Sequence, residues 1–390
     1  MKRSVLLLLL VALWVMPVQA EVSTDTSAPI LSVAAEGSHA LALDARGRVW
    51  AWGSNQRGES VPGSAEPRAT VPTPVMENAV AIACGQQFSL ALCADGRLYG
   101  WGDNLSKQIP GLNAEKADEI TPIMENIARV HACDDRAIAV TADGKAYLWG
   151  GGGEMRIVSE NALDARVGAD CLLILTENGD AEFLGSPDYY ENGVAPEAPA
   201  RVLTNCTSVS ASGQTLIACT NGGEIFVWGA NGTDGRLGLS QTGWIYDPTK
   251  LPIENALRGI SGLSCSAALT ESRSLYVWGT LYSYVTAFGE NGGALTSLVD
   301  GTLIFYGNEP ILLYENALDI AFGDAFAVLL LSDGSVLTWG SNDQGQIGDG
   351  THTETELVAG EDSEDEDELV IVSSEQRIFP VYLMNLNSPS

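Results

Sequence analysis

The sequence offers few residues of the kinds that usually carry catalysis. Its three histidines, His39, His131 and His352, lack the spacing of a metal-ligand set, and no nucleophile motif accompanies them. Carboxylates are frequent, with 50 Asp and Glu against 20 Lys and Arg and a formal net charge of −30. A catalytic carboxylate pair needs no linear motif, so activity on an extracellular polymer stays open as an alternative. We predict no enzymatic activity, no metal site and no cofactor.

Seven cysteines are too few and too scattered for a disulfide framework. Cys206 and Cys219 are the best candidates for a bridge, because they lie about symmetrically around one predicted hairpin turn. Cys171 and Cys265 lie close to turns, and we expect them to be plain buried thiols.

Large aromatic residues gather in three connecting segments that are rich in glycine, proline and acidic residues. Aromatics on loops over a rigid scaffold are common in binding surfaces, although they could equally pack down on the rim of the fold. The candidate binding residues are Tyr189, Tyr190, Trp244, Tyr246, Tyr282, Tyr284 and Phe288.

An acidic run occupies residues 361–368, with the sequence EDSEDEDE. It has none of the fixed glycine and ligand spacing of a calcium-binding loop. We expect a solvated, low-complexity loop.

One stretch, residues 76–102, recurs seven times along the chain. It predicts three short strands, with an Asp-Gly turn at Asp95-Gly96 before the third. An aromatic-Gly pair closes the third strand in six units: Trp52-Gly53, Trp101-Gly102, Trp149-Gly150, Trp228-Gly229, Trp278-Gly279 and Trp339-Gly340. Leu184-Gly185 takes the remaining place. Fixed spacing inside units, with variable spacing between them, indicates a repeat architecture.

A fourth, Pro-led apolar strand precedes a Glu-Asn pair in most units, as Pro74-Val75-Met76 precedes Glu77-Asn78. Four strands in each of seven units predict an all-β, seven-bladed β-propeller, whose blades bury one another's faces.

The repeat resembles that of the regulator of chromosome condensation family, a seven-bladed propeller. The resemblance rests on Trp-Gly-x-Asn followed by Gly-x-Leu-Gly. These motifs stand at Trp228-Gly229-Ala230-Asn231 with Gly235-Arg236-Leu237-Gly238, and at Trp339-Gly340-Ser341-Asn342 with Gly345-Gln346-Ile347-Gly348. His39 alone keeps the histidine of the family's hairpin, which implies a structural role for it. The resemblance covers about residues 30–386 and implies protein–protein recognition on a propeller face.

The C-terminal residues 379–386 resemble the Pro-led strand of other units, whereas the first unit has no such strand before it. We therefore predict that the C-terminal strand completes the first blade and closes the ring. Strands alternate in direction, so the long connectors, the acidic run and the first hairpin of each unit should share one face. The Asp-Gly turns should open on the other face.

The first twenty residues have the pattern of a secretory signal. Lys2-Arg3 precedes the apolar run of residues 5–16, and Val18-Gln19-Ala20 offers a cleavage site. We assign residues 1–20 to a signal peptide, 21–29 to a polar segment and 30–390 to the propeller. Three asparagines, Asn104, Asn205 and Asn231, match the glycosylation pattern, which matters only if the host's export pathway glycosylates.

These observations favour a secreted, non-catalytic, monomeric propeller that binds an extracellular or cell-surface protein through one loop face. A polysaccharide-active or glycan-binding propeller is the alternative. The export signal and the negative charge argue against nucleotide exchange, chromatin or any nucleic acid. We expect no membrane insertion after signal cleavage.

Overall fold

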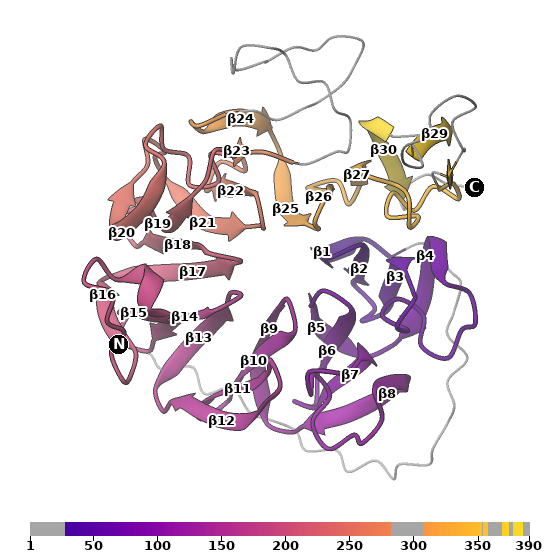
Figure 1. Cartoon of the computed structure of the whole chain (residues 1–390), viewed down its shortest axis with the longest axis horizontal. Coiled ribbons are helices and arrows are strands. Elements are labelled where there is room, and N and C mark those ends of the chain that lie inside the picture. The colour runs from indigo at the N-terminus through magenta and orange to yellow at the C-terminus, as the bar shows by residue number, and fades with distance from the viewer. Residues whose placement is uncertain (1–27, 282–306, 353, 358–368, 374–376, 385–390) are drawn as a thin grey trace, which may run out of the picture.

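Seven four-stranded antiparallel sheets stand around one axis as the blades of a propeller, which confirms the predicted fold. The structure is a computed structural model that describes residues 28–281, 307–352, 354–357, 369–373 and 377–384. Figure 1 looks down the axis, and the chain passes through the blades in order. A single short 3-10 helix, η1 (Pro187–Tyr189), interrupts the strands of the described residues.

Each blade consists of four strands, which we call inner, second, third and outer. The inner strands surround the axis: β1 (Ile30–Glu36), β5 (Ala79–Cys84), β9 (Ile127–Cys133), β13 (Ala162–Val167), β17 (Cys206–Ser212), β21 (Ala256–Ser261) and β25 (Ala317–Phe322). The second strands are β2 (His39–Asp44), β6 (Phe88–Cys93), β10 (Arg136–Thr141), β14 (Cys171–Thr176), β18 (Thr215–Thr220), β22 (Cys265–Thr270) and β26 (Phe326–Leu331).

The third strands end on the aromatic-Gly marker or just after it: β3 (Val49–Ser54), β7 (Leu98–Asp103), β11 (Ala146–Gly150), β15 (Ala181–Gly185), β19 (Ile225–Asn231), β23 (Leu275–Gly279) and β27 (Val336–Gly340). The outer strands are β4 (Arg68–Met76), β8 (Lys116–Met124), β12 (Gly153–Ser159), β16 (Ala200–Leu203), β20 (Gly243–Lys250), β24 (Ile311–Tyr314) and β30 (Arg377–Met384). One extra hairpin, β28 (Glu354–Leu357) with β29 (Leu369–Ser373), lies between β27 and β30 in the sequence.

Local sequence explains the reversals of the chain. Gly96 takes a φ of 82° in the turn between β6 and β7, a conformation that costs glycine little. A Glu-Asn pair links the outer strand to the next inner strand at five blade boundaries, with Thr204-Asn205 at the remaining one, and Asn78 in the first of these links has a φ of 65°. Asparagine tolerates this left-handed region better than other residues with a Cβ, which accounts for its recurrence.

The core lies between the blades. All six residues of β6, with the sequence FSLALC, are buried, because both faces of a blade pack against neighbours. The side chains of Trp52, Trp101, Trp149 and Trp228 are also fully buried. This layered packing explains why the second strands have continuous apolar runs instead of strict alternation.

The prediction that the C-terminal strand completes the first blade is wrong. β30 pairs with β27 as the outer strand of the seventh blade, with Val381 opposite Thr338. The outer place of the first blade is filled by β4. The Pro-led strand belongs to the blade whose aromatic-Gly marker precedes it, and the Glu-Asn pair behind it is the link to the next blade. The structural unit is therefore shifted by one strand from the predicted one: each blade begins with its inner strand and ends with its outer strand, which is the Pro-led strand in most blades.

The ring therefore closes by packing and by isolated hydrogen bonds between the first and seventh blades. The backbone N–H of Asp324 donates to the carbonyl of Gly37 at 2.9 Å. Phe326 of the seventh blade shares a core cluster with Ala42 and Trp52 of the first. Each blade keeps its own four strands, and no sheet is shared across the junction.

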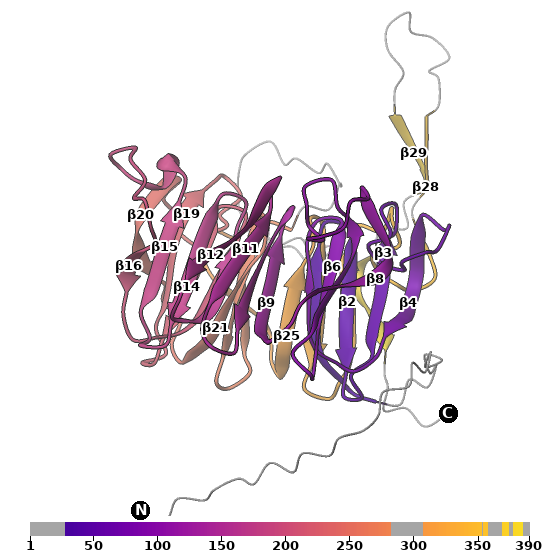
Figure 2. The same cartoon turned by 90° about the horizontal axis from the view of Figure 1, so that it is seen from below.

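Alternating strand direction gives the ring two different faces (Figure 2). The connector face carries the inner-to-second hairpins, the third-to-outer connectors and the projecting β28–β29 hairpin. The turn face carries the second-to-third turns and the Glu-Asn links. The connectors and the first hairpins share one face as predicted. The acidic run at residues 361–368 lies outside the described residues.

Candidate interaction face

The asparagine of Trp-Gly-x-Asn fixes the connector that follows it. Asn104 Oδ1 accepts from the N–H of Ile109 at 2.8 Å, and its Nδ2 donates to the carbonyl of Ala114 at 2.7 Å. Asn231 makes the same kind of contact with the N–H of Leu237 at 3.1 Å. One buried amide side chain thereby replaces the backbone pairing that an irregular segment lacks. The motif has a structural role and leaves the outer surface of the connectors open for contact.

Four of the six marker tryptophans each join a connector to the next blade. Their indole Nε1 atoms donate to a backbone carbonyl in the preceding blade's connector. The pairs are Trp52 with Gln346 at 2.8 Å, and Trp101 with Glu59, Trp149 with Gln108 and Trp278 with Arg236, each at 2.9 Å. Two of these acceptors, Arg236 and Gln346, are the second residue of the Gly-x-Leu-Gly motif or its Ile variant. The two halves of the family signature thus meet across blade boundaries.

One exception to this pattern, at the fourth blade, follows from the short connector of the third blade. The third blade turns directly from β11 to β12 through Gly151 and Gly152, both at positive φ. So short a turn offers no connector segment to accept an indole, and the next blade carries Leu184 where the others have tryptophan.

Side chains also cross between connectors. Arg57 Nη2 lies 2.7 Å from Asp103 Oδ1, which joins the first blade to the second. Gln56 Nε2 donates to Gln344 Oε1 at 3.2 Å, which joins it to the seventh. Lys107 of the second blade pairs with Glu154 of the third. The connectors of blades seven, one, two and three therefore form one interlocked surface.

Three of the predicted binding aromatics pack into the fold instead of projecting from it. Tyr189 is buried, its ring lies 4.8 Å from that of Trp244, and its hydroxyl donates to Asp170 at 2.9 Å. Tyr190 stacks on Phe183 at 5.9 Å, and its hydroxyl accepts from the N–H of Gly185.

This cluster lies between the fourth and fifth blades, where Trp228 Nε1 makes no hydrogen bond and packs edge-on to Phe183 at 6.4 Å. The aromatic packing stands in for the missing indole bond at this junction. Among the predicted aromatics, Tyr246 is exposed, at 41%. Tyr282, Tyr284 and Phe288 lie outside the described residues.

At the centre of the connector face, carboxylates gather around the propeller axis. They come from the ends of inner strands and from the hairpins that follow. We call this set the acidic mouth: Glu36, Asp134, Asp135, Asp170 and Asp324.

Burial, with the carboxylates of Asp134 and Asp324 nearby, raises the pKa of Glu36 to about 8. Its carboxyl accepts a backbone hydrogen bond from Asp134 and lies 3.8 Å from Cys133 Sγ. Burial is also the main cause of the raised pKa values of Asp134 and Asp324. Glu36 is therefore protonated at neutral pH, and the other carboxylates of the acidic mouth supply the negative charge that favours a cationic group from a partner.

The histidines take structural positions. His39 is fully buried, its Nε2 lies 2.9 Å from Ser89 Oγ, and burial lowers its pKa to about 3. Burial, with the Arg166 cation nearby, lowers the pKa of His131 well below its usual range. Both rings are neutral at physiological pH. Although His39 contacts the hydroxyl of Ser89, that hydroxyl lies 2.8 Å from the carbonyl oxygen of Glu59, and His39 Nδ1 has no hydrogen-bond partner among the described residues, so no carboxylate completes a catalytic triad there.

The structure does not form the predicted bridge between Cys206 and Cys219. Both are free, buried thiols. A bulge in β17 shifts the register, so Cys206 lies opposite Thr220 and Cys219 lies opposite Ser208. Cys171 and Cys265 are buried as expected, and burial raises the pKa of Cys171 to about 12.

The three glycosylation motifs differ in access. Asn104 and Asn231 are buried, and their amide groups hold connectors. Asn205 is exposed on the link between β16 and β17. Only Asn205 of the three could accept a glycan without unfolding a connector.

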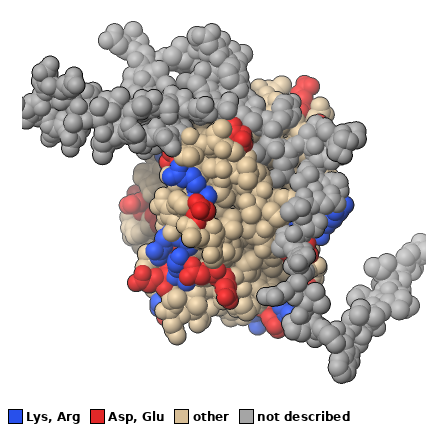
Figure 3. Space-filling view, turned by 90° about the vertical axis from the view of Figure 1, so that its right-hand side faces the viewer, with Lys and Arg blue, Asp and Glu red and all other residues tan. Residues whose placement is uncertain are grey.

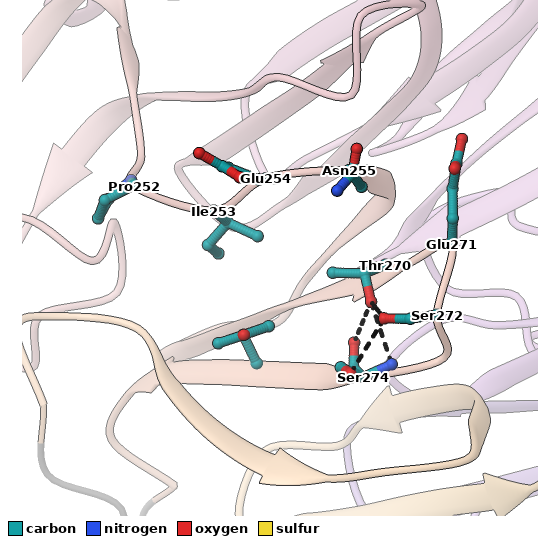
Figure 4. Close-up of a pocket in the computed structure, with 9 residues that line it drawn as sticks. Pro252, Ile253, Glu254, Asn255, Thr270, Glu271, Ser272 and Ser274 are labelled. Carbon is teal, nitrogen blue, oxygen red and sulfur yellow. Dashed lines mark hydrogen bonds between the residues drawn. The ribbon is translucent and has the colours of Figure 1, made fainter.

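A polar hollow opens on the turn face beside the sixth blade (Figure 4). Its floor is a hydroxyl cluster, with Thr270 Oγ1 2.9 Å from Ser272 Oγ. The side chains of Glu254 and Glu271 point away from each other, with Asn255 between them. They do not converge on a common point, so this hollow lacks the geometry of a glycosidase pair.

The sequence model of the RCC1-like domain matches residues 14–359. The chain belongs to the RCC1-like domain family. The staggered Trp–carbonyl contacts and the asparagine clamps are thus the way in which this RCC1-like domain uses its family signature.

Two curated relatives show how far the likeness extends. The RCC1 domain-containing protein RUG3, mitochondrial, of Arabidopsis thaliana is 28% identical over 152 residues, covering 36% of this chain and 32% of the relative. The secretion-regulating guanine nucleotide exchange factor of Bos taurus is 29% identical over 200 residues, covering 46% and 41%. This RCC1-like chain therefore matches about a third to two fifths of the length of these relatives.

Solved structures agree on the fold. Human WBSCR16 has a TM-score of 0.67 at 17% identity, covering 87% of this chain and 95% of that one. Prp20p of Saccharomyces cerevisiae has a TM-score of 0.68 at 17% identity, covering 88% and 87%. At such identities the likeness extends to the fold alone. Within the part that the structure describes, the RCC1-like chain has no helix long and apolar enough to cross a membrane.

Proposed function

We propose that this chain is a secreted, non-catalytic propeller that binds an extracellular or cell-surface protein through its connector face. The RCC1-like propeller fold supports a role in protein interaction. The signal-like residues 1–20 support export, and they lie outside the described residues.

The interlocking of the connectors is the observation that carries the proposal. Four consecutive blades are joined through Trp52, Arg57, Trp101, Lys107 and Trp149. A surface held in one shape before contact loses little conformational entropy on binding. Loops fixed on a rigid scaffold are also the usual place for recognition.

Charge indicates the chemistry of the partner. The acidic mouth lies at the centre of this face, whereas on the side shown in Figure 3 acidic and basic side chains lie next to one another. A partner with a basic contact surface would be attracted to the mouth, and a phosphate backbone would be repelled. We therefore propose no guanine nucleotide exchange activity for this chain, although the name of the Bos taurus relative includes that activity.

Affinity capture can test this proposal. The chain from residue 21 onward would be immobilised and exposed to secreted and surface proteins of its source. A variant with Asp134→Asn and Asp324→Asn removes two charges of the mouth. The matched variant, Glu119→Gln with Asp247→Asn, removes two exposed charges from the outer strands β8 and β20.

We expect the same protein on the wild type and on the matched variant, and about tenfold less on the mouth variant. All three proteins should unfold at similar temperatures. Retention of no protein by the wild type, or equal retention by the mouth variant, would contradict the proposal.

A further inference from the structure

The Glu-Asn pair that recurs along the sequence has a continuation that its turn role does not explain. In four links the pair is followed by alanine and then by an apolar residue: Glu77-Asn78-Ala79-Val80, Glu160-Asn161-Ala162-Leu163, Glu254-Asn255-Ala256-Leu257 and Glu315-Asn316-Ala317-Leu318. In three of these links the asparagine (Asn78, Asn255 or Asn316) takes a positive φ, and the alanine is buried in all four. The turn itself requires neither the glutamate nor the apolar residue.

The apolar residue is a bulge in every one of these inner strands. In β5 the register with β6 jumps from Ala79 to Ala81, so Val80 has no opposite residue. The same jump passes over the second residue of each inner strand: Leu31, Val80, Ala128, Leu163, Thr207, Leu257 and Leu318. Bulges of this kind re-aim a side chain and are kept as designed features of a fold.

These bulges expose large apolar side chains at one place. Leu31 is 58% exposed, Val80 54%, Leu163 50% and Leu257 51%. All inner strands begin at the turn face and surround the axis (Figure 1), so these residues surround the axis on that face. We call them, together with Leu318, the apolar collar. A single exposed apolar residue needs no explanation, but four exposed apolar residues at the same position of a repeat do.

The glutamates of the links stand three residues before the collar residues. Glu77, Glu160, Glu254 and Glu315 form no ion pair within the described part of the chain, whereas Glu125 lies 3.5 Å from Arg97. The links and turns of this face carry twelve carboxylates (Glu77, Asp95, Glu125, Asp143, Glu160, Glu177, Asp180, Glu224, Glu254, Glu271, Glu315 and Asp333). The cations beside them are Arg46, Arg48, Arg97, Lys145, Lys250 and Arg273, and Arg129 and Arg258 lie in the inner strands next to the collar position. The collar itself is apolar, the residues that follow it in the inner strands include Asp164, Arg258 and Asp319, and the links and turns around it are mostly acidic.

We infer that the turn face is a second docking surface, for a protein segment whose apolar side chains are flanked by lysines or arginines. The apolar side chains would cover the collar, and the cations would meet the link glutamates. A second copy of this chain is excluded as occupant by charge, since it would bring the same carboxylates together. An anionic lipid surface is repelled for the same reason. The collar has gaps at two blades: the fifth has Thr204 and Thr207 in place of the glutamate and the apolar residue, and the third has Ala128 in place of a large apolar residue.

Fluorescence anisotropy with two labelled peptides tests this inference on the chain from residue 21 onward. The probe is Lys-Lys-Gly-Leu-Leu-Gly-Lys-Lys, and the control peptide replaces its leucines by serines. We expect the leucine peptide to bind about tenfold tighter than the serine peptide. Equal affinity of the two peptides, or no binding of the leucine peptide, would overturn the inference.

Protein variants then locate the site. The collar variant carries Leu31→Ser, Val80→Ser, Leu163→Ser and Leu257→Ser. Its matched control carries serine at four apolar residues exposed elsewhere: Val71, Leu105, Val194 and Leu312. We expect the preference for the leucine peptide to vanish in the collar variant and to persist in the control. The reverse result, or no difference between them, would overturn the inference.

A charge variant separates the two parts of the surface. Glu160→Gln, Glu254→Gln and Glu315→Gln should weaken both peptides several-fold at low salt and keep the preference for leucine. The matched control, Glu119→Gln, Asp247→Asn and Glu309→Gln, removes as many exposed charges elsewhere. If this control weakened binding as much as the variant at Glu160, Glu254 and Glu315, overall charge alone would explain the binding. That result would contradict the assignment of the site to the turn face. The mouth variant of the proposed function leaves this face intact, so either proposal can fail without the other.

Discussion

The indole Nε1 of Trp52 donates a hydrogen bond of 2.8 Å to the carbonyl of Gln346 and so joins the first blade to the seventh. The same contact recurs between Trp101 and Glu59 one blade further on. The junction between the first and seventh blades is therefore held by the same kind of Trp–carbonyl hydrogen bond as the junction between the first and second blades.

Replacing Trp52 with phenylalanine should destabilise the protein by about 1–3 kcal/mol, because it leaves the carbonyl of Gln346 buried without its donor. Trp228→Phe is the matched control, since Trp228 Nε1 has no hydrogen-bond partner. Chemical denaturation should show a larger loss for Trp52→Phe than for the control. Equal losses would mean that the indole bond contributes nothing beyond packing.

Deleting residues 377–390 should remove the outer strand of the seventh blade and expose β27 as an edge. We expect a lower unfolding temperature, a tendency to aggregate, and faster hydrogen exchange in β27 than in β3. Deletion of residues 385–390 alone is the control and should leave exchange in β27 unchanged. Loss of protection in β3 instead of β27 would favour the first-blade closure that the structure rejects.

The pKa of Glu36 predicts a pH dependence of stability. Between its usual value of 4.5 and about 8, the folded protein holds a proton that the unfolded chain has released. Stability should therefore fall as pH rises through this window, by up to about 1.4 kcal/mol per pH unit. The groups that face this carboxyl are Cys84, Cys133, Asp134 and Asp324.

Glu36→Gln should flatten that slope and be more stable than the wild type at the upper end of the window, because the amide stays neutral. Urea unfolding measured across the window gives the comparison, with the exposed Glu160→Gln as control. A slope that survives in Glu36→Gln would assign the titration to another group.

The links predict a backbone effect at Asn78, whose φ is 65°. Asn78→Ala should cost about 1–2 kcal/mol, because a Cβ without a compensating side chain disfavours this conformation. Asn78→Gly should be nearly neutral. Thermal unfolding would compare the stability of the two variants with that of the wild type. Equal stability of both variants would show that the link relaxes to another conformation.

The fold was readable from the sequence because its signals are local and repeated. The Asp-Gly turns, the aromatic-Gly marker and the buried second strands each specify a short segment, and their sevenfold recurrence predicts the propeller. The sequence did not show in the same way which blade each Pro-led strand belongs to. A Pro-led strand looks alike whether it begins one unit or ends another, and pairing between β27 and β30 spans the long insertion that contains β28 and β29.

The candidate site was less predictable, since burial depends on tertiary contacts. Tyr189 and Trp244 are far apart in sequence, and only the folded chain brings their rings together. Glu36, Asp134 and Asp324 carry no shared motif, because they meet only through the closure of the ring. The apolar residue after each Glu-Asn-Ala was visible in the sequence, but its exposure follows from a bulge in register.

Hydrogen exchange of the propeller bound to its captured partner tests the central claim most directly. The claim predicts slower exchange in the connectors at residues 54–61 and 103–109 and in the hairpins at 36–38 and 323–325, with the outer strands β8 and β20 unchanged. Exchange in the connectors that stays as fast in the complex as in the free protein would contradict the claim.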